Sequence, residues 1–112
     1  MKILITGGAG FIGSHLVDAC IDAWNNVCIV DDFSSGARAN IEQHKNNVRL
    51  LICEGDICDV HRMKSIFHSF QPEVVFHLAA QINVRESIKN PQRDVEVNIL
   101  WTLNILEAMR EV

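Results

Sequence analysis

The sequence predicts an α/β fold, in which a four-stranded parallel sheet is flanked by helices. Three observations support this prediction: four short apolar runs alternate with segments of helical periodicity, the runs are apolar throughout, and a glycine cluster joins the first run to the first helical segment. Continuous apolar runs are typical of parallel strands that are covered on both faces. Right-handed crossovers between such strands give the predicted strand order 3-2-1-4.

The first half of the chain contains two of these strands. Residues 3–5 are predicted to form the first strand and residues 27–30 the second. Between them, apolar side chains recur at helical spacing: Phe11, Ile12, Leu16, Val17, Cys20, Ile21 and Trp24. Asn25 or Asn26 is expected to end this helix, because asparagine tolerates the left-handed conformation at a helix C-terminus. The polar segment 37–45 is predicted to be helical as well.

The second half repeats the alternation. Residues 48–53 and 74–76 are predicted to form the third and fourth strands, and Asp59 is a predicted N-cap for a helix over residues 60–70. A short helical turn is expected over residues 85–89. Asn90 and Pro91 then have the residue types of an N-cap and a first helical position, which predicts a long final helix to about Glu111.

The predicted final helix is apolar around much of its circumference. Two stripes are expected, one formed by Val95, Ile99, Leu103 and Leu106 and the other by Val97, Trp101, Ile105, Ala108 and Val112. One stripe should face the sheet, and the other should face a missing part of the chain or a second protomer. The alternative is an over-hydrophobic end of a fragment. Because the fourth strand also leaves an unpaired edge, we expect a homo-oligomer through the 91–111 helix or that sheet edge.

The glycine cluster has the pattern of a phosphate-binding turn. Gly8, Gly10 and Gly13 form G-x-G-x-x-G, whereas Gly7, Gly10 and Gly13 form G-x-x-G-x-x-G. Glycines in such a turn permit a tight bend, close approach of a pyrophosphate and close packing of the helix on the strand, as in a Rossmann-type half-domain. The pyrophosphate would lie at the helix N-terminus. No G-K-[ST] follows, which excludes a nucleoside-triphosphate P-loop.

Acidic residues follow the second and third strands. Asp31 lies 18 residues after Gly13, at the position where a carboxylate accepts hydrogen bonds from ribose hydroxyls and favours NAD over NADP. Asp32 could share or disturb this role. Asp56 could reach an adenine amino group beside the Ile57 backbone, or it could be an ordinary solvated turn residue.

Small side chains after the fourth strand, Leu78, Ala79 and Ala80, would let a cofactor pass close to the backbone, although a tight strand–helix turn needs them too. His77 is the histidine nearest this predicted cleft. We expect a direct role in the site less strongly for His77 than for these three residues.

The bulk composition narrows the class of protein. A chain of 112 residues is long enough for one domain. Its net charge of −4 does not favour binding to nucleic acid, which is itself negatively charged. No apolar run is long enough to cross a membrane, and no signal peptide is evident, so we expect a cytoplasmic location. The four cysteines, Cys20, Cys28, Cys53 and Cys58, have no zinc-site spacing and are expected to be small buried side chains. The chain contains no tyrosine.

Five motifs in this order resemble the N-terminal part of extended short-chain dehydrogenases/reductases, specifically the NAD-dependent nucleotide-sugar epimerase/dehydratase family of the UDP-glucose 4-epimerase type. They are Thr6-Gly-Gly-Ala-Gly-Phe-Ile-Gly13, Asp31-Asp-Phe-Ser-Ser-Gly36, Gly55-Asp-Ile-Cys-Asp59, His77-Leu-Ala-Ala-Gln81 and Val84-Arg-Glu-Ser-Ile-Lys-Asn-Pro91. The resemblance covers the whole chain and implies NAD as the cofactor. It places Gly7, Gly10, Phe11, Ile12 and Gly13 at the pyrophosphate, Asp31, Asp32, Phe33, Ser35 and Gly36 around the adenosine ribose, Asp56 and Ile57 at adenine, and Leu78, Ala79 and Ala80 at the nicotinamide.

The departures from the family pattern concern catalysis and packing. The family removes a sugar hydroxyl proton with the tyrosine of a Y-x-x-x-K motif, which this sequence lacks. Residues 1–112 are therefore expected to be a partial NAD-binding domain without the catalytic region and the sugar-binding domain, inactive alone and in contact with a nucleotide sugar only through the missing part. The alternatives are a non-catalytic regulatory module and an inert truncated fragment. Trp24 and Trp101 stand where the family usually has glycine, which indicates either altered packing or a sequence drifting free of constraint.

Overall fold

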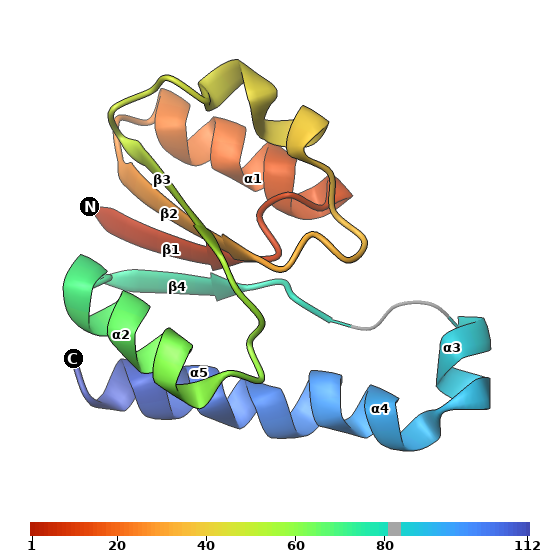
Figure 1. Ribbon diagram of the computed structural model, residues 1–112. Helices are drawn as coiled ribbons and strands as arrows, with labels where there is room; N and C mark the ends of the chain where they lie inside the picture. The colour runs from red at the N-terminus through yellow and green to blue at the C-terminus, as the bar shows by residue number, and fades with distance from the viewer. Residues whose placement is uncertain (81–83) are drawn as a thin grey trace.

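The computed structural model describes residues 1–80 and 84–112 and confirms the predicted sheet. Its strands are β1 (Lys2–Thr6), β2 (Asn26–Asp31), β3 (Leu50–Glu54) and β4 (Val74–His77), and they pair in the order β3-β2-β1-β4 (Figure 1). All three pairings are parallel, and Ile3 of β1 is in register with Val27 on one side and Val74 on the other. All four strands therefore end at the same edge of the sheet.

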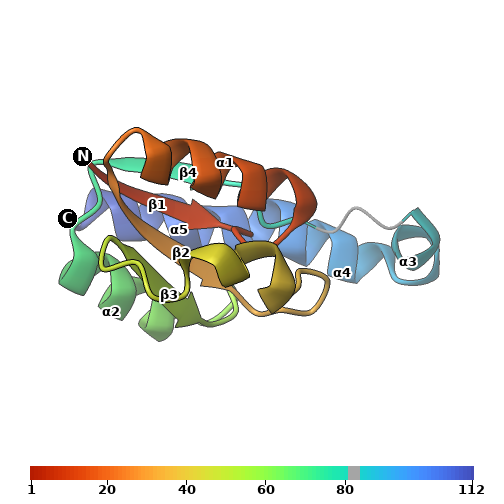
Figure 2. The same cartoon turned by 90° about the horizontal axis from the view of Figure 1, so that it is seen from above.

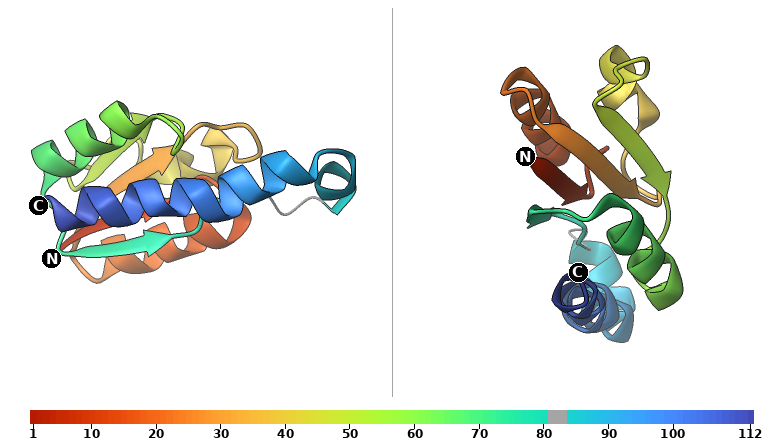
Figure 3. Two further views of the ribbon diagram at one scale, coloured as in Figure 1. Left: turned by 90° about the horizontal axis from the view of Figure 1, so that it is seen from below. Right: turned by 90° about the vertical axis from the view of Figure 1, so that its left-hand side faces the viewer.

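Helices cover both faces of this sheet. The helix α1 (Phe11–Asp22) and the 3₁₀ helix η1 (Arg38–His44) lie on one face, whereas α2 (Val60–Phe70) and α5 (Trp101–Arg110) lie on the other (Figure 3). The short helices α3 (Val84–Lys89) and α4 (Pro91–Val95) extend beyond the sheet and lead into α5 through a π-helical segment, η2 (Glu96–Leu100) (Figure 2).

Alternate residues of the central strands build two separate cores. Ile3, Ile5 and Ile29 point toward α1, and their cluster includes Val17 and Ile21 of that helix. Leu4, Cys28 and Val30 point the other way, into a cluster that contains Met63, Ile66 and Phe67 of α2 and Ile105 and Ala108 of α5. The apolar runs in the sequence thus reflect strands that are buried on both faces.

Of two local predictions in the first half of the chain, the helix over residues 37–45 is confirmed in 3₁₀ form, and the predicted end of the first helix is wrong. Trp24, with φ 66°, occupies the left-handed position after α1, not Asn25 or Asn26. The Asn25 side chain instead makes two hydrogen bonds: it donates to the Cys20 carbonyl at 3.1 Å and accepts from the N-terminal ammonium at 3.0 Å. The polar segment 37–45 is a 3₁₀ helix, whose end is closed by an i→i+3 bond of 3.2 Å from the Lys45 N–H to the Glu42 carbonyl.

The third strand begins later than predicted. Asn47 closes a turn there, because its carbonyl accepts from the Leu50 N–H at 3.0 Å and its side chain accepts from the Arg49 N–H at 2.9 Å. This turn leaves Val48 fully in solvent and moves the start of β3 to Leu50.

Both predicted N-caps in the second half are confirmed. The Asp59 carboxylate accepts from the Arg62 N–H at 3.0 Å, and the Asn90 side chain accepts from the Arg93 N–H at 3.1 Å. The long final helix is confirmed as one continuous helical segment formed by α4, η2 and α5, and the π-helical turn of η2 lies directly before Trp101. Trp101 packs against the α2-side core, and the Arg93 guanidinium lies 4.3 Å from the centre of its ring.

Candidate functional site

In the glycine turn after β1, each of the four glycines either packs closely or has a backbone conformation that favours glycine. The patterns G-x-G-x-x-G and G-x-x-G-x-x-G therefore each describe part of the turn. Gly7 has φ 71°, a conformation that favours glycine, and a Cβ on it would lie 2.9 Å from the Ala79 nitrogen. A Cβ on Gly13 would overlap the Gly7 carbonyl, so α1 packs directly on the turn. Gly8 is pressed against β2, since its Cβ would lie 2.7 Å from the Ile29 side chain.

The N-terminus of α1 faces outward without a cap from any described side chain. Gly10 is the N-cap residue, in extended conformation, and the first turn contains no acidic residue. Phe11 and Ile12 of that turn are 80% and 70% exposed. The first N–H groups of a helix have no intrahelical partner, and the helix dipole makes this end positive. The turn can therefore receive an anion such as a phosphate.

Asp31 links the glycine turn to the end of β2. Its side chain is only 8% exposed, and one carboxylate oxygen accepts from the Ala9 N–H at 2.9 Å while the other accepts from the Phe33 N–H at 2.8 Å. Each carboxylate oxygen can accept a second hydrogen bond. Asp31 is thus held beside the turn with acceptor capacity left for a ligand hydroxyl.

Asp32 points away from this arrangement. Its carboxylate accepts from the Ser34 N–H at 2.9 Å and from the Ser34 hydroxyl at 2.7 Å, in an exposed turn. Of the two consecutive aspartates, the structure therefore brings only Asp31 into contact with the glycine turn.

The loop after Asp32 closes against the same turn. Phe33, with φ 59°, packs under the Arg38 guanidinium, which lies 4.1 Å from its ring centre. Gly36 abuts Ala9, whose carbonyl carbon would lie 2.9 Å from an added Cβ. Phe33 and Gly36 thus lie near the glycine turn, whereas Ser35 is exposed at the loop surface.

The turn after β3 is placed beside Asp31 by the Gly55 N–H, which donates to the Asp31 carbonyl at 3.0 Å. The Asp56 side chain accepts from the Cys58 N–H at 3.0 Å. The Ile57 side chain lies in the α2-side core and is 5% exposed, and its carbonyl accepts from Asn104 at 3.0 Å. Ile57 can therefore offer a ligand its backbone N–H but not its side chain.

The segment after β4 is held by a polar chain that sequence reasoning missed. The Thr6 hydroxyl oxygen accepts from the Leu78 and Ala79 N–H groups at 3.1 and 3.2 Å, and it lies 2.6 Å from Nδ1 of His77. Since its acceptor sites are then occupied, the hydroxyl donates to Nδ1. Nε2 of His77 then carries the proton and donates to the Thr102 hydroxyl at 3.0 Å.

This arrangement requires a neutral imidazole, and burial lowers the pKa of His77, which favours that form. His77 therefore positions the segment rather than facing a ligand. The sequence signal was a threonine before the glycines together with a histidine at the end of a neighbouring strand. Leu78, Ala79 and Ala80 consequently run directly past Gly7.

The cysteines do not match the expectation of four buried side chains. Cys20 and Cys28 are buried, but Cys53 is half-buried and Cys58 is exposed. Cys58 lies in the turn after β3, at a strand end rather than within a strand. Within residues 1–80 and 84–112, no group of histidine, cysteine and acidic side chains could hold a metal ion.

The fold and this site define a dinucleotide-binding α/β protein: a parallel sheet, a glycine turn with an open helix N-terminus, and an acid at the end of the adjacent strand. The sequence model of the family described as GDP-mannose 4,6 dehydratase matches residues 4–112. The chain therefore belongs to this family of nucleotide-sugar epimerases and dehydratases.

Similar proteins agree with this assignment. The UDP-glucose 4-epimerase of Mycolicibacterium smegmatis is 41% identical over 110 residues, which is 98% of this chain and 35% of that protein. The dTDP-glucose 4,6-dehydratase 1 of Escherichia coli is 42% identical over 112 residues, or 98% of this chain and 31% of that protein. The UDP-glucose 4-epimerase of Thermus thermophilus, solved in complex with NAD, superposes with a TM-score of 0.89 and 38% identity over 99% of this chain and 34% of that one.

The chain thus spans about a third of the length of the relatives it matches. Among the helices of the described residues, none combines the length and apolar character needed to cross a membrane.

Proposed function

We propose that this chain is the NAD-binding segment of a nucleotide-sugar epimerase or dehydratase. The observation that carries the proposal is the direct link between the open N-terminus of α1 and Asp31, made by the 2.9 Å bond from the Ala9 N–H to the Asp31 carboxylate. This link sets a phosphate-binding turn and a ribose acceptor side by side. The relative from Thermus thermophilus, with the same fold, was solved with NAD.

The residues around this turn fit the parts of a dinucleotide. Side chains are absent where a pyrophosphate would need close approach to the backbone, and the first N–H groups of α1 would hold its negative charge. Asp31 would accept from the adenosine ribose, and its charge would repel a 2′-phosphate. The proposed contact residues are Gly7, Gly10, Phe11, Ile12 and Gly13 for the pyrophosphate, Asp31, Asp32, Phe33, Ser35 and Gly36 for the ribose, Asp56 and the Ile57 backbone for adenine, and Leu78, Ala79 and Ala80 for the nicotinamide.

Hydride acceptance is the chemistry that NAD supplies, and this chain contributes binding and orientation. Thr6 and His77 fix the backbone of Leu78 and Ala79 against Gly7, which would define one wall for the nicotinamide. The chain has no tyrosine to remove a sugar hydroxyl proton. Residues 1–112 alone are therefore proposed to bind NAD without epimerising UDP-glucose or UDP-galactose, and turnover of either sugar nucleotide by this polypeptide would contradict that part of the proposal.

The outer stripe of the final helical segment supports self-association. Val95, Ile99, Leu103 and Leu106 are each about half exposed, whereas Ile105 and Ala108 face the sheet and are buried. An amphipathic helix normally leaves polar residues in solvent. The stripe is therefore proposed to pack on a second copy of the chain, or on the remainder of a longer protein that also binds the nucleotide sugar.

Calorimetric titration tests the cofactor. NAD is expected to bind with a dissociation constant on the order of micromolar, and NADP about tenfold or more weakly because of the Asp31 charge. Failure of a folded chain to bind millimolar NAD would contradict the proposal and favour an inert segment.

Two variants control the titration. Gly10→Ala should fold, since Gly10 is extended and the nearest atom to its added Cβ is 3.3 Å away, yet its methyl group would obstruct the phosphate. We expect it to lose NAD binding while remaining folded, with a slightly lower melting temperature because the added Cβ is in tight contact with the Gly7 carbonyl oxygen. Asp22→Asn removes an exposed charge at the other end of α1, outside the proposed contact residues, and should retain binding.

A further inference from the structure

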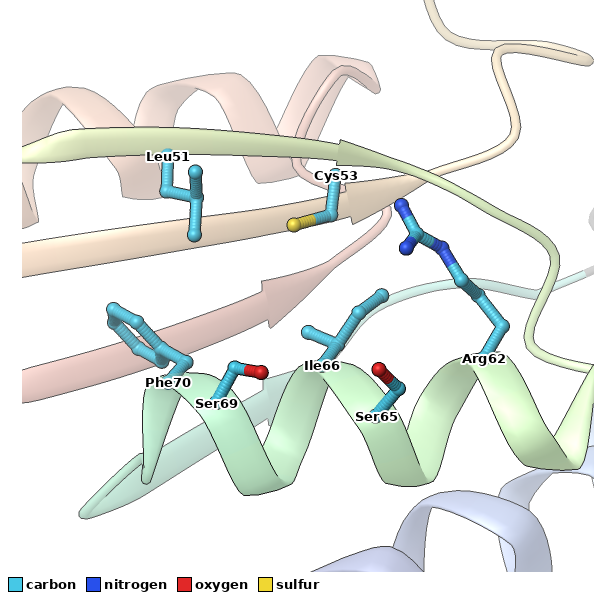
Figure 4. Close-up of a pocket in the computed structure, with 7 residues that line it drawn as sticks. All are labelled: Leu51, Cys53, Arg62, Ser65, Ile66, Ser69 and Phe70. Atoms are coloured by element: carbon cyan, nitrogen blue, oxygen red, sulfur yellow. The ribbon is translucent and has the colours of Figure 1, made fainter.

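A cavity of about 190 Å³ lies between β3 and α2, on the face of the sheet opposite α1. Its lining combines apolar, hydroxyl, cationic and thiol groups, as Figure 4 shows: Leu51, Cys53, Arg62, Ser65, Ile66, Ser69 and Phe70. The Cys53 sulfur points into the space between β3 and α2 (Figure 4). The Arg62 guanidinium lies at the same end of the cavity as Cys53. The cavity therefore combines a nucleophile with a positive charge.

A second thiol lies directly behind Cys53. Cys28 of β2 is fully buried, and its sulfur is 3.8 Å from the Cys53 sulfur, close enough for its S–H to donate to Cys53. The strand register explains the contact, because Cys53 is paired with Val30, two positions along β2 from Cys28 on the same face. The two cysteines are therefore an accessible thiol and a buried donor.

These neighbours act on the two sulfurs in opposite directions. The hydrogen bond from Cys28 and the charge of Arg62 lower the pKa of Cys53 to about 7, against the effect of its partial burial. The same hydrogen bond and burial raise the pKa of Cys28. The only charged residue next to Cys53 along β3 is Glu54, which is paired with Arg38 at 2.9 Å. A thiolate at Cys53 is thus favoured by groups from β2 and α2.

We propose that Cys53 is a modification site for small anionic disulfides, which enter the cavity with a carboxylate toward Arg62. The Cys53 thiolate attacks one sulfur of the disulfide R–S–S–R, a new S–S bond forms between Cys53 and that sulfur, and R–S⁻ leaves. The step conserves electrons and needs no other oxidant, because the disulfide is itself reduced to the released thiolate. Cys28 remains the buried S–H donor that stabilises the attacking sulfur.

The other thiols provide the comparison. Cys20 of α1 is buried in the core between that helix and the sheet, and burial raises its pKa. Cys58 is the exposed cysteine, but partial burial and the neighbouring Asp56 raise its pKa more than the charge of Arg93 lowers it. The carboxylates of Asp56 and Asp59 also oppose the approach of an anionic reagent. Exposure alone predicts that Cys58 reacts first, whereas the proposal predicts that Cys53 does.

The test uses the dianionic disulfide 5,5′-dithiobis(2-nitrobenzoate) at pH 7, with release of the coloured thiolate as the readout. The chain with Cys58→Ser, which keeps Cys53, should react about tenfold faster than the chain with Cys53→Ser, which keeps Cys58. Equal rates, or faster reaction of the Cys53→Ser chain, would overturn the proposal. No cofactor takes part, so the result is independent of the proposed NAD site.

Two further variants, both in the Cys58→Ser chain, test the roles of the neighbours. Cys28→Val removes the S–H donor while keeping an apolar core residue, and it should slow the reaction severalfold and move the midpoint of its pH profile from about 7 toward 8.5. Arg62→Gln should remove the preference for the dianionic reagent over the neutral disulfide of 2-mercaptoethanol. Unchanged rates, midpoint and preference in folded variants, verified by circular dichroism, would contradict the site.

Discussion

The helices α1 and α5 lie on opposite faces of one sheet, yet the chain covers them very differently. α1 buries Val17, Cys20 and Ile21 against β1 and β2, and its outward positions include the polar His15 and Asp22. α5 buries Ile105 and Ala108, but Leu103 and Leu106 on its other side remain 53% and 52% exposed. Apart from Phe11 and Ile12 in its first turn, α1 thus leaves no large apolar side chain exposed, whereas α5 carries a second apolar stripe that this chain leaves in solvent.

The largest effect should come from truncating the inner stripe of α5. Ile105 is 1% exposed and packs in the α2-side core, so Ile105→Ala removes buried methyl groups and leaves a cavity. We expect the free energy of unfolding to fall by about 3 kcal/mol. Urea denaturation at low protein concentration, where self-association contributes little, measures this loss.

Leu106→Ala is the matched control from the neighbouring position. Half of the Leu106 surface is already in solvent, so its truncation should cost less than about 1 kcal/mol in dilute protein. The same change should weaken self-association in sedimentation experiments, if the outer stripe packs on a second copy. Equal losses of stability for both variants would remove the distinction between the stripes.

A pH titration probes the polar chain that joins the two halves. Thr6 of β1, His77 of β4 and Thr102 of α5 are connected through a neutral imidazole. Burial lowers the pKa of His77 in the folded chain below its ordinary value of about 6.5. Below pH 6.5 the unfolded chain therefore binds the proton more readily than the folded chain, and stability falls as the pH falls toward the folded pKa.

His77→Gln keeps a donor and an acceptor but does not titrate. It should cost about 1 kcal/mol near neutral pH, through less favourable hydrogen bonds. Its unfolding free energy should then decline less steeply than that of the wild type between pH 7 and pH 5. Identical slopes for the two proteins would show that His77 is equally accessible to protons in both states.

The sheet and the glycine turn could be predicted because their signals are local. The apolar runs fixed which segments pair, and the helical segments between them left one right-handed strand order. Asp59 was identified as an N-cap from its place before a helical pattern, and its carboxylate does accept from the Arg62 N–H. Asp31 was recognised by its distance from the glycines, and the structure places it against Ala9.

The features that escaped prediction depend on contacts between distant segments. Thr6 and His77 are 71 residues apart, and the sulfurs of Cys28 and Cys53 meet only because β2 and β3 pair in one register. The π-helical segment before Trp101 gives no sign in the apolar spacing, which continues through it. Periodicity identifies elements and faces, but it does not identify which polar or thiol groups meet across them.

The smallest effect should come from Trp24, just after the end of α1. This residue has φ 66° and is 81% exposed, and its ring lies 4.6 Å from the Arg49 guanidinium. The left-handed conformation costs a non-glycine residue about 1–2 kcal/mol, whereas an exposed cation–π contact returns about 0.5–1 kcal/mol. Trp24→Gly should therefore raise the free energy of unfolding by about 0.5 kcal/mol. Trp24→Ala keeps the backbone penalty and loses the ring contact, so it should not stabilise. If thermal denaturation shows equal gains for both variants, the benefit comes from removing an exposed indole and not from the backbone.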